Sequence, residues 1–435
     1  MSEESGLPRA SLLRHLRMDL SPLRDSRDFR LLMGSGVITM LGSFLTLVTL
    51  PLQMMQLTGS YVAVGLLSVA EFVPMLVCGL WGGAIADALD RRRIVLFAEV
   101  GLAVMAALLA VNALLPSPQV WALYVLGALM AGLDSLQRPS LDALVPRVVR
   151  HDQLTAAAAL TSFRWNFGAI AGPALAGLIV AAFGPAATYG IDLLTFLVSL
   201  ALLWRVRTVP PAENSAPASL TSLVEGVRYA VGRPDLMGTY LVDMAAMFFA
   251  MATALYAFIA TEFGGVETLG LLYSAGAVGA LLASVTSGWT RSVHRHGLGV
   301  VVAAIAWGVA MGAAAFAPNL WTILLCLALA GGADMISGVF RSTIWNQTIP
   351  DEFRGRLAGI ELLSYSSGPM LGGARASLFA QFGGLRFSLG AGGLLCVGAV
   401  GLLAAFLPAL RRYDARTDEN ALAQAARRKA LAADA

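Results

Sequence analysis

Charged residues are scarce in this sequence, and lysine is almost absent. Charged side chains make up 13% of the 435 residues, about half the roughly 25% of an ordinary soluble domain. Lys429 is the sole lysine, and it follows Arg428 instead of a glycine. The Gly-Lys-Ser/Thr element of a phosphate-binding loop is therefore missing, which excludes an ATP-hydrolysing cassette within this sequence.

Histidine and cysteine are also too few, and too scattered, to build a metal, haem or disulfide framework. The four histidines fall in expected loops and the three cysteines inside apolar runs. No nucleophile with a neighbouring base stands out, which argues against a membrane-embedded enzyme. The net charge of +3 comes without a basic patch interleaved with aromatics, so nucleic acid is not an expected partner. We expect no cofactor and no metal.

Hydrophobic residues, at 57% of the chain, are gathered in runs long enough to cross about 30 Å of hydrocarbon. Only helices or closed barrels satisfy backbone polar groups in lipid, and these runs are too long for barrel strands. The first run, from Leu31, is too long for a signal-peptide core, so we expect it to be retained. The fold class is therefore an all-α membrane protein with twelve expected helices: 31–56, 62–86, 94–114, 119–139, 157–182, 186–204, 236–261, 268–289, 298–316, 320–340, 358–380 and 386–409.

Arginines indicate the orientation of these helices. They are concentrated in the leader, in the loops that follow even-numbered spans, and in the tail. The loops that follow odd-numbered spans hold only Arg386. Basic residues favour the cytoplasmic side of a membrane. Both termini are therefore expected to be cytoplasmic.

The two halves of the chain echo each other. Residues 128–134 and 328–334 agree at four of seven positions, ending in Asp134 and Asp334. A parallel repeat of six helices relates the two halves by an axis along the membrane normal. The expected organisation is a leader at 1–30, a six-helix bundle at 31–204, a linker at 205–235, a second six-helix bundle at 236–410 and a tail at 411–435.

A small-residue helix end runs into an acid and an arginine cluster after the second span, from Gly82 to Arg93. This segment resembles the G-x-L-x-D-r-x-G-R-R signature loop of the major facilitator superfamily, with Asp90 in place of the second glycine and Ala88 in place of the arginine after the acid. The resemblance implies an inner gate in which Asp87, with Arg91 and Arg92, holds the halves together. A plain positive-inside anchor and turn is the alternative.

A glycine-proline motif occurs in both halves. Gly168, Gly172 and Pro173 stand in the fifth span. Ser364, Gly368 and Pro369, followed by Gly372, repeat them in the eleventh. Glycines four apart let helices approach closely, and a proline kinks the helix. The motif resembles an element of the drug–proton antiporters, although helix packing alone is an equal alternative.

The resemblance covers about residues 28–410 and extends to the enterobactin-exporter subgroup of this superfamily through residues 112–116 and 348–356. It implies two pseudo-symmetric six-helix halves and proton-driven export of a siderophore or hydrophobic drug from a bacterial inner membrane. The partners would be a small-molecule substrate, protons and the lipid bilayer, with the protein as a monomer. An uptake carrier or lipid flippase on the same fold stays open.

Acidic side chains inside the spans are candidates for proton binding. Asp134 and Arg138 stand one turn apart, which allows them to pair and serve in a gate. Glu71 lies about 15 Å into its span at 1.5 Å per residue, with no arginine within a turn. Such residues are costly in a membrane and usually functional. We expect Glu71 to couple protons, with Asp243 and Asp334 next; a structural hydrogen bond or contact with a cationic substrate are the alternatives.

Overall fold

The computed structural model describes residues 19–88, 90–207 and 220–433 of the chain, although the side chains of some residues inside the helices, 82–88 and 361 among them, are not described. Every regular element within these ranges is a helix, and none is a strand. The expected all-helical fold class is confirmed.

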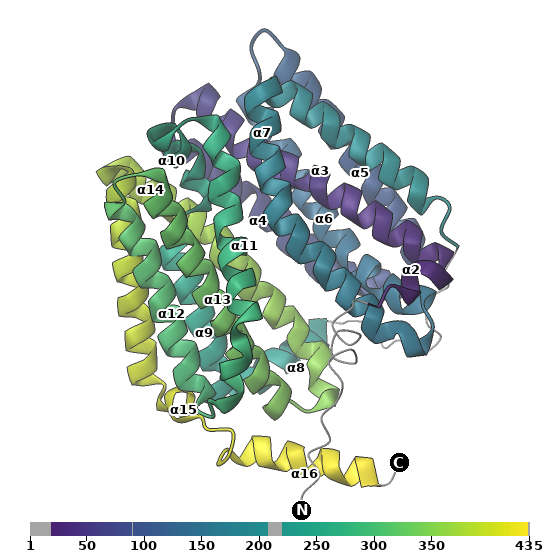
Figure 1. Cartoon of the computed structure of the whole chain (residues 1–435), viewed down its shortest axis with the longest axis vertical. Helices are drawn as coiled ribbons and strands as arrows, with labels where there is room; N and C mark the ends of the chain where they lie inside the picture. Colours follow the sequence, from purple (N-terminus) through teal and green to yellow (C-terminus); the bar gives the residue numbers. More distant parts are fainter. Residues whose placement is uncertain (1–18, 89, 208–219, 434–435) are drawn as a thin grey trace, which may run out of the picture.

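Two groups of long helices stand beside each other (Figure 1). They lean together at one end and diverge toward the end where α16 (Glu419–Ala433) lies across the molecule. The first group consists of α3 (Arg27–Thr58), α4 (Tyr61–Ala88), α5 (Arg91–Leu114), α6 (Val120–Val148) and α7 (Leu154–Leu203). The second consists of α9 (Pro234–Ala250), α10 (Tyr256–Phe263), α11 (Leu269–Val285), α12 (His296–Ala313), α13 (Leu320–Thr348) and α14 (Asp351–Phe406).

Ten helical stretches in the described ranges are long and apolar enough to cross a bilayer. Two of them each join two expected spans across a kink: α7 at Gly184 and α14 at Gly384. These glycines have φ of 74° and 82°, which residues with a β-carbon adopt at a cost. The breaks are as far apart in the sequence as Asp134 and Asp334, so they follow the same repeat.

Divided at those glycines, the helices match the expected spans one to one, although α6 and α13 run eight or nine residues beyond the expected ends at 139 and 340, and α14 begins seven residues before 358. One span also differs in kind. The range 236–261 is not continuous, because α9 ends at Ala250, a short turn follows at Thr253–Leu255, and α10 begins at Tyr256. Arg375 of α14 donates to the carbonyl oxygens of Phe248 (3.2 Å) and Met251 (3.3 Å). A buried arginine therefore satisfies carbonyls that the interrupted helix leaves free.

Four further helices lie outside the expected spans or at the edge of one. The linker range 205–235 contains α8 (Leu220–Val231), α15 (Pro408–Arg412) bridges the end of the second bundle and the start of the tail, and the tail contains α16. A short helix, α2 (Ser21–Asp25), precedes α3. These segments were expected only as connections, since none is long enough to span a bilayer.

Close helix approach joins the two groups at the end away from α16. A β-carbon on Gly65 of α4 would lie 2.5 Å from the β-carbon of Ser377 of α14. The rings of Tyr61 and Phe258 are 4.2 Å apart between centroids. Small residues thus let α4 and α14 touch near the start of α4, and the rings of Tyr61 and Phe258 add an aromatic contact at the same end.

The helices α7 and α11 make the matching contact on the other side. A β-carbon on Gly177 would lie 2.5 Å from the backbone nitrogen of Gly270. The hydroxyl of Ser274 donates to the carbonyl oxygen of Ile170 at 2.7 Å. The two groups are therefore joined by two helix pairs, α4 with α14 and α7 with α11.

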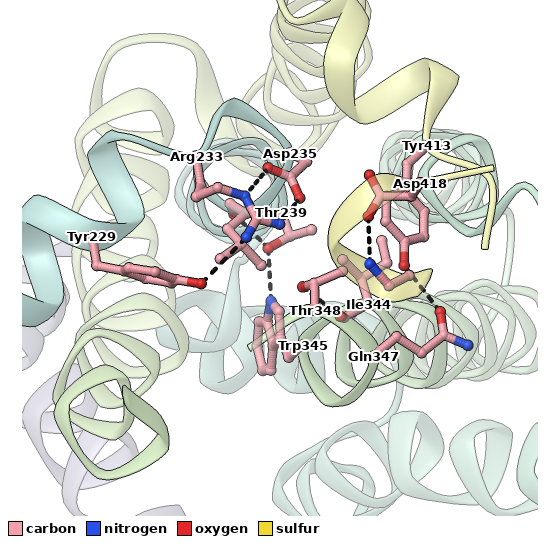
Figure 2. Close-up of polar contacts among 12 residues, drawn as sticks. Tyr229, Arg233, Asp235, Thr239, Ile344, Trp345, Gln347, Thr348, Tyr413 and Asp418 are labelled. Atoms are coloured by element: carbon pink, nitrogen blue, oxygen red, sulfur yellow. Dashed lines mark hydrogen bonds and ion pairs between the residues drawn. The ribbon is translucent and has the colours of Figure 1, made fainter. Parts of the chain in front are cut away.

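Polar contacts hold the linker helix and the tail against the second group, as Figure 2 shows. Arg233 donates to both carboxylate oxygens of Asp235, at 2.9 and 2.5 Å, and to the hydroxyl of Tyr229 at 3.3 Å. The hydroxyl of Tyr413 donates to the side-chain oxygen of Gln347 at 3.0 Å. The linker helix and the described part of the tail therefore pack on the second group.

Candidate functional site

A cavity of about 460 Å³ lies between the two groups of helices. Glu71 and Asp134 line it from the first group, and Tyr273 and Met370 from the second. Most of the remaining lining is apolar, including Leu50, Leu67, Met75, Met130, Phe196, Met251 and Pro369. We call this space the central cavity. Because both groups contribute to its wall, any movement of one group against the other changes its shape.

Glu71 is placed in the central cavity by close packing of α4 on α6. A β-carbon on Gly127 would lie 3.1 Å from the Glu71 carboxylate and 2.8 Å from Leu50, so a larger residue there would have to displace one of these side chains. Pro74 lies one turn further along α4. Among the described contacts, no hydrogen bond or ion pair reaches the Glu71 carboxylate. It can therefore bind a proton or a ligand without breaking an existing ion pair.

A second cavity, of about 570 Å³, lies within the first group and shares Asp134 with the central cavity. Glu99, Arg138 and Arg164 also line it. The Arg138 guanidinium lies over the Trp165 ring, 5.0 Å from its centroid. In the described part no ion pair within 4.0 Å joins Arg138 to Asp134, and the described contact of the guanidinium is the cation–π contact with Trp165.

Two acids in the first group are fully buried and are bonded by hydroxyl groups instead of arginines. Glu99 is 1% exposed and accepts from the Thr39 hydroxyl at 3.2 Å, while its second oxygen has no described partner. Asp192 is 0% exposed and accepts from Thr46 at 2.5 Å and from Thr195 at 3.2 Å. The first group thus holds acids without a paired cation.

The second group arranges its acids around one arginine. Arg341 forms an ion pair with Asp243 and lies 3.6 Å from the carboxylate of Asp334. Asp243 also accepts a hydrogen bond from the Ser364 hydroxyl at 3.0 Å. All three charged side chains line a cavity of about 390 Å³. The sequence singled out Asp243 and Asp334 as candidates. Arg341, which contacts both, lies two turns after Asp334 along α13.

The segment that resembles the signature loop is described only in part. The side chain of Asp87 lies outside the described residues, so its proposed gate contact has no description here. Arg91 is buried, and Arg92 donates to the carbonyl oxygens of Leu203 (3.4 Å) and Trp204 (2.5 Å). Arg92 therefore ties the start of α5 to the end of α7 within the first group.

Asp90, which stands where the family pattern has glycine, has a local role. Its carboxylate accepts a hydrogen bond from the backbone nitrogen of Arg92 at 3.0 Å, which caps the amino end of α5. Aspartate at this position stabilises a helix start. An aspartate directly before a helical run is a sequence signal of such a cap.

The glycine-proline motifs make the same contacts in the two groups. A β-carbon on Gly168 or Gly172 of α7 would overlap Met40 and Phe44 of α3. A β-carbon on Gly368 or Gly372 of α14 would overlap Met247 of α9. Pro173 and Pro369 lie inside these helices, and Pro369 also lines the central cavity. The motif thus packs the fifth span on the first and the eleventh on the seventh.

No group of three or more histidine, cysteine or acidic side chains in the described ranges could hold a metal ion. The three cysteines are free. The arrangement offers acids, arginines and an apolar cavity wall, which suits binding and release of a small molecule more than covalent chemistry.

A family model described as "Transmembrane secretion effector" matches residues 18–432. The chain is 28% identical over 403 residues to the enterobactin exporter EntS of Citrobacter koseri, covering 91% of this chain and 95% of the relative. It is 29% identical over 404 residues to the enterobactin exporter EntS of Salmonella typhimurium, covering 91% and 96%.

Solved transporter structures share the fold. The nucleoside transporter NupG superposes with a TM-score of 0.71 at 13% identity, covering 89% of this chain and all of that one. A bacterial homologue of the iron transporter ferroportin, in its inward-facing state, superposes with a TM-score of 0.65 at 18% identity, covering 89% and 99%. These likenesses establish the major facilitator fold, and the relatives are transporters and not enzymes.

Proposed function

Because the chain belongs to the transmembrane secretion effector family, a family of transporters with the major facilitator fold, we propose that it is a proton-coupled exporter. Its substrate class is a siderophore or hydrophobic drug, and it works by alternating access. The name of the enterobactin exporters to which it is 28–29% identical supports the siderophore class. The observation that carries the proposal is the central cavity, walled by both groups and containing Glu71 without a described partner.

The transport cycle follows from how the two groups meet. The groups rock about the helix pairs α4–α14 and α7–α11, and the central cavity then faces each side of the membrane in turn. The apolar wall accepts the hydrophobic part of a substrate. Glu71 binds a proton when the cavity faces the outside and releases it when water reaches the cavity from the inside.

In this proposal the end at which the two groups diverge in Figure 1 faces the cytoplasm. We place α16 and both termini on that side, with residues 31–204 and 236–410 as the moving halves and the bacterial inner membrane as the location. The positive-inside distribution of arginine supports this orientation.

Cysteine labelling tests the orientation. In a cysteine-free background, a membrane-impermeant thiol reagent applied to intact cells should label Gln119→Cys, which is exposed between α5 and α6. It should not label Arg93→Cys, whose side chain is 84% exposed at the opposite end of α5. Permeabilised cells serve as the control, since both positions should then react. Labelling of Arg93→Cys in intact cells would reverse the orientation.

The energy source is tested in everted membrane vesicles that contain the protein. A growth screen of deleted and overexpressing cells first selects a substrate, beginning with enterobactin, the compound in the relatives' name. Vesicles without ATP should then accumulate it when a pH gradient is imposed, and should lose it when a protonophore is added. Accumulation that requires ATP and ignores the gradient would contradict proton coupling. Transport in the opposite direction would favour an uptake carrier.

A further inference from the structure

A long groove runs along the outside of the second group, between α11, α12 and α13. Its volume is about 1030 Å³, at the upper end of the roughly 300–1,000 Å³ of small-molecule sites. We call it the outer groove. It shares no lining residue with the central cavity or with the cavity around Arg341, so it is a separate feature of the molecule.

Small residues form the floor of the outer groove. A β-carbon on Gly279 of α11 would overlap the carbonyl oxygen of Ala328 of α13, which means that the two backbones touch there. Ala283 and Gly332 continue this floor. Because no large side chain rises from the floor, the groove stays deep where two packed helices would normally present a ridge.

The walls of the groove face the bilayer. Leu282, Val302, Leu325 and Leu329 line it and are 57–62% exposed. In a membrane protein, exposed leucine and valine on the outside of a bundle contact acyl chains. A hydrocarbon chain is therefore the occupant that the walls select.

One end of the groove is cationic. Arg295 and Arg416 lie at this end with a single acid, Asp414. Asp414 accepts a hydrogen bond from the backbone nitrogen of Arg416 at 3.0 Å, and the Arg416 side chain contacts His294. Arg295 is exposed and has no described ion pair or hydrogen bond. Its guanidinium is free to bind an anion from the membrane.

The length of the groove fits one leaflet. From Leu325 to Phe340 along α13 is about 22 Å at 1.5 Å per residue, which matches one leaflet with its head groups, half of a bilayer about 40–45 Å thick. The cationic end lies beside the chain that connects α15 to α16, because Arg416 belongs to this connection and the backbone nitrogen of Ala415 donates to the carbonyl oxygen of His294 at 3.1 Å. Basic pockets between membrane helices bind anionic head groups. We propose that the outer groove is a binding site for an anionic phospholipid, with its head group at Arg295 and Arg416 and its acyl chains between α11 and α12.

Native mass spectrometry of the delipidated full-length protein tests the proposal, with phosphatidylglycerol and phosphatidylcholine as probes. Phosphatidylglycerol should stay bound at activation energies that remove phosphatidylcholine. Arg295→Ala should weaken phosphatidylglycerol binding about fivefold, the effect of about one basic residue near a lipid surface. Arg291→Ala is the matched control, because Arg291 is exposed in the same loop but does not line the groove.

Filling the groove gives an independent readout. Ala306 is exposed and lines the groove, so Ala306→Phe should displace the lipid, whereas Ala405→Phe on the outside of α14 should not. Equal retention of the two lipids, or unchanged binding in Ala306→Phe, would overturn the proposal. So would competition by inorganic phosphate alone, which would indicate a free-anion site. A dimer that Ala306→Phe dissociates would assign the groove to a second copy of the chain.

Discussion

In the second half of the molecule Asp243 and Asp334 both lie against Arg341, whereas in the first half Glu71 faces the central cavity with no described cation beside it. The difference is not one of fold, because the two halves share their repeat, their glycine breaks and their helix packing. It is one of charge balance. Protonating Asp243 breaks an ion pair, whereas protonating Glu71 breaks none, so the first half is better suited to take up and release protons.

The largest expected effect of this difference is on transport. Glu71→Gln keeps the shape and polarity of the side chain but replaces the titratable carboxyl group with an amide that cannot bind and release a proton. Uphill accumulation in vesicles should disappear, while exchange of labelled for unlabelled substrate across the membrane survives. Asp334→Asn is the matched change in the second half and should leave a large part of uphill transport, because Arg341 keeps Asp243 as its partner.

This comparison fails if the two variants behave alike. Uphill transport with an unchanged pH dependence in Glu71→Gln would move the coupling role to the second half. Loss of exchange as well as accumulation would instead indicate that Glu71 contacts the substrate directly.

A smaller but still large effect is expected on stability. Arg341→Ala leaves Asp243 buried without its cation, and breaking a buried ion pair in this way costs about 3–5 kcal/mol. The matched change in the first half is Arg138→Ala, which removes a cation–π contact with Trp165 worth about 0.5–1 kcal/mol at exposed sites. Thermal unfolding of the purified variants in detergent measures both.

The double variant Arg341→Met with Asp243→Asn serves as the control, because it removes both charges together and should recover much of the lost stability. Equal destabilisation by Arg341→Ala and Arg138→Ala would show that charge balance does not distinguish the two halves.

Hydropathy was enough to predict the helical fold, because lipid leaves a chain few alternatives and each long apolar run must be a helix. The orientation predicted from arginine placement, and the depth of Glu71 in the membrane, stay predictions. The role of Arg341 did not follow from the sequence, because its contact with Asp243 joins α13 to α9 and depends on packing between helices far apart in sequence.

Other parts of the site lay between these extremes. The cap formed by Asp90 could have been read from the sequence, since an aspartate precedes the helical run, but the family pattern drew attention to the missing glycine instead. The role of Arg375 could not have been predicted from the sequence. The carbonyl oxygens that it binds are left without helical partners only because α9 is interrupted.

The smallest expected difference between the halves concerns one close-packed glycine in each half. A β-carbon on Gly372 would lie 2.5 Å from the carbonyl oxygen of Met247, a backbone atom that α9 holds in place, so Gly372→Ala should cost about 1–3 kcal/mol through overpacking. A β-carbon on Gly172 would instead meet the ring of Phe44. That ring borders the 570 Å³ cavity of the first half and can swing into it. Gly172→Ala should therefore lower the unfolding temperature less than Gly372→Ala, and Phe44→Leu should relieve the destabilisation that remains.

If both alanine variants unfold at the same temperature as the unmodified protein, the glycines are not close-packing positions. If Gly172→Ala is the less stable of the two, Phe44 is fixed and the first half is packed as rigidly as the second.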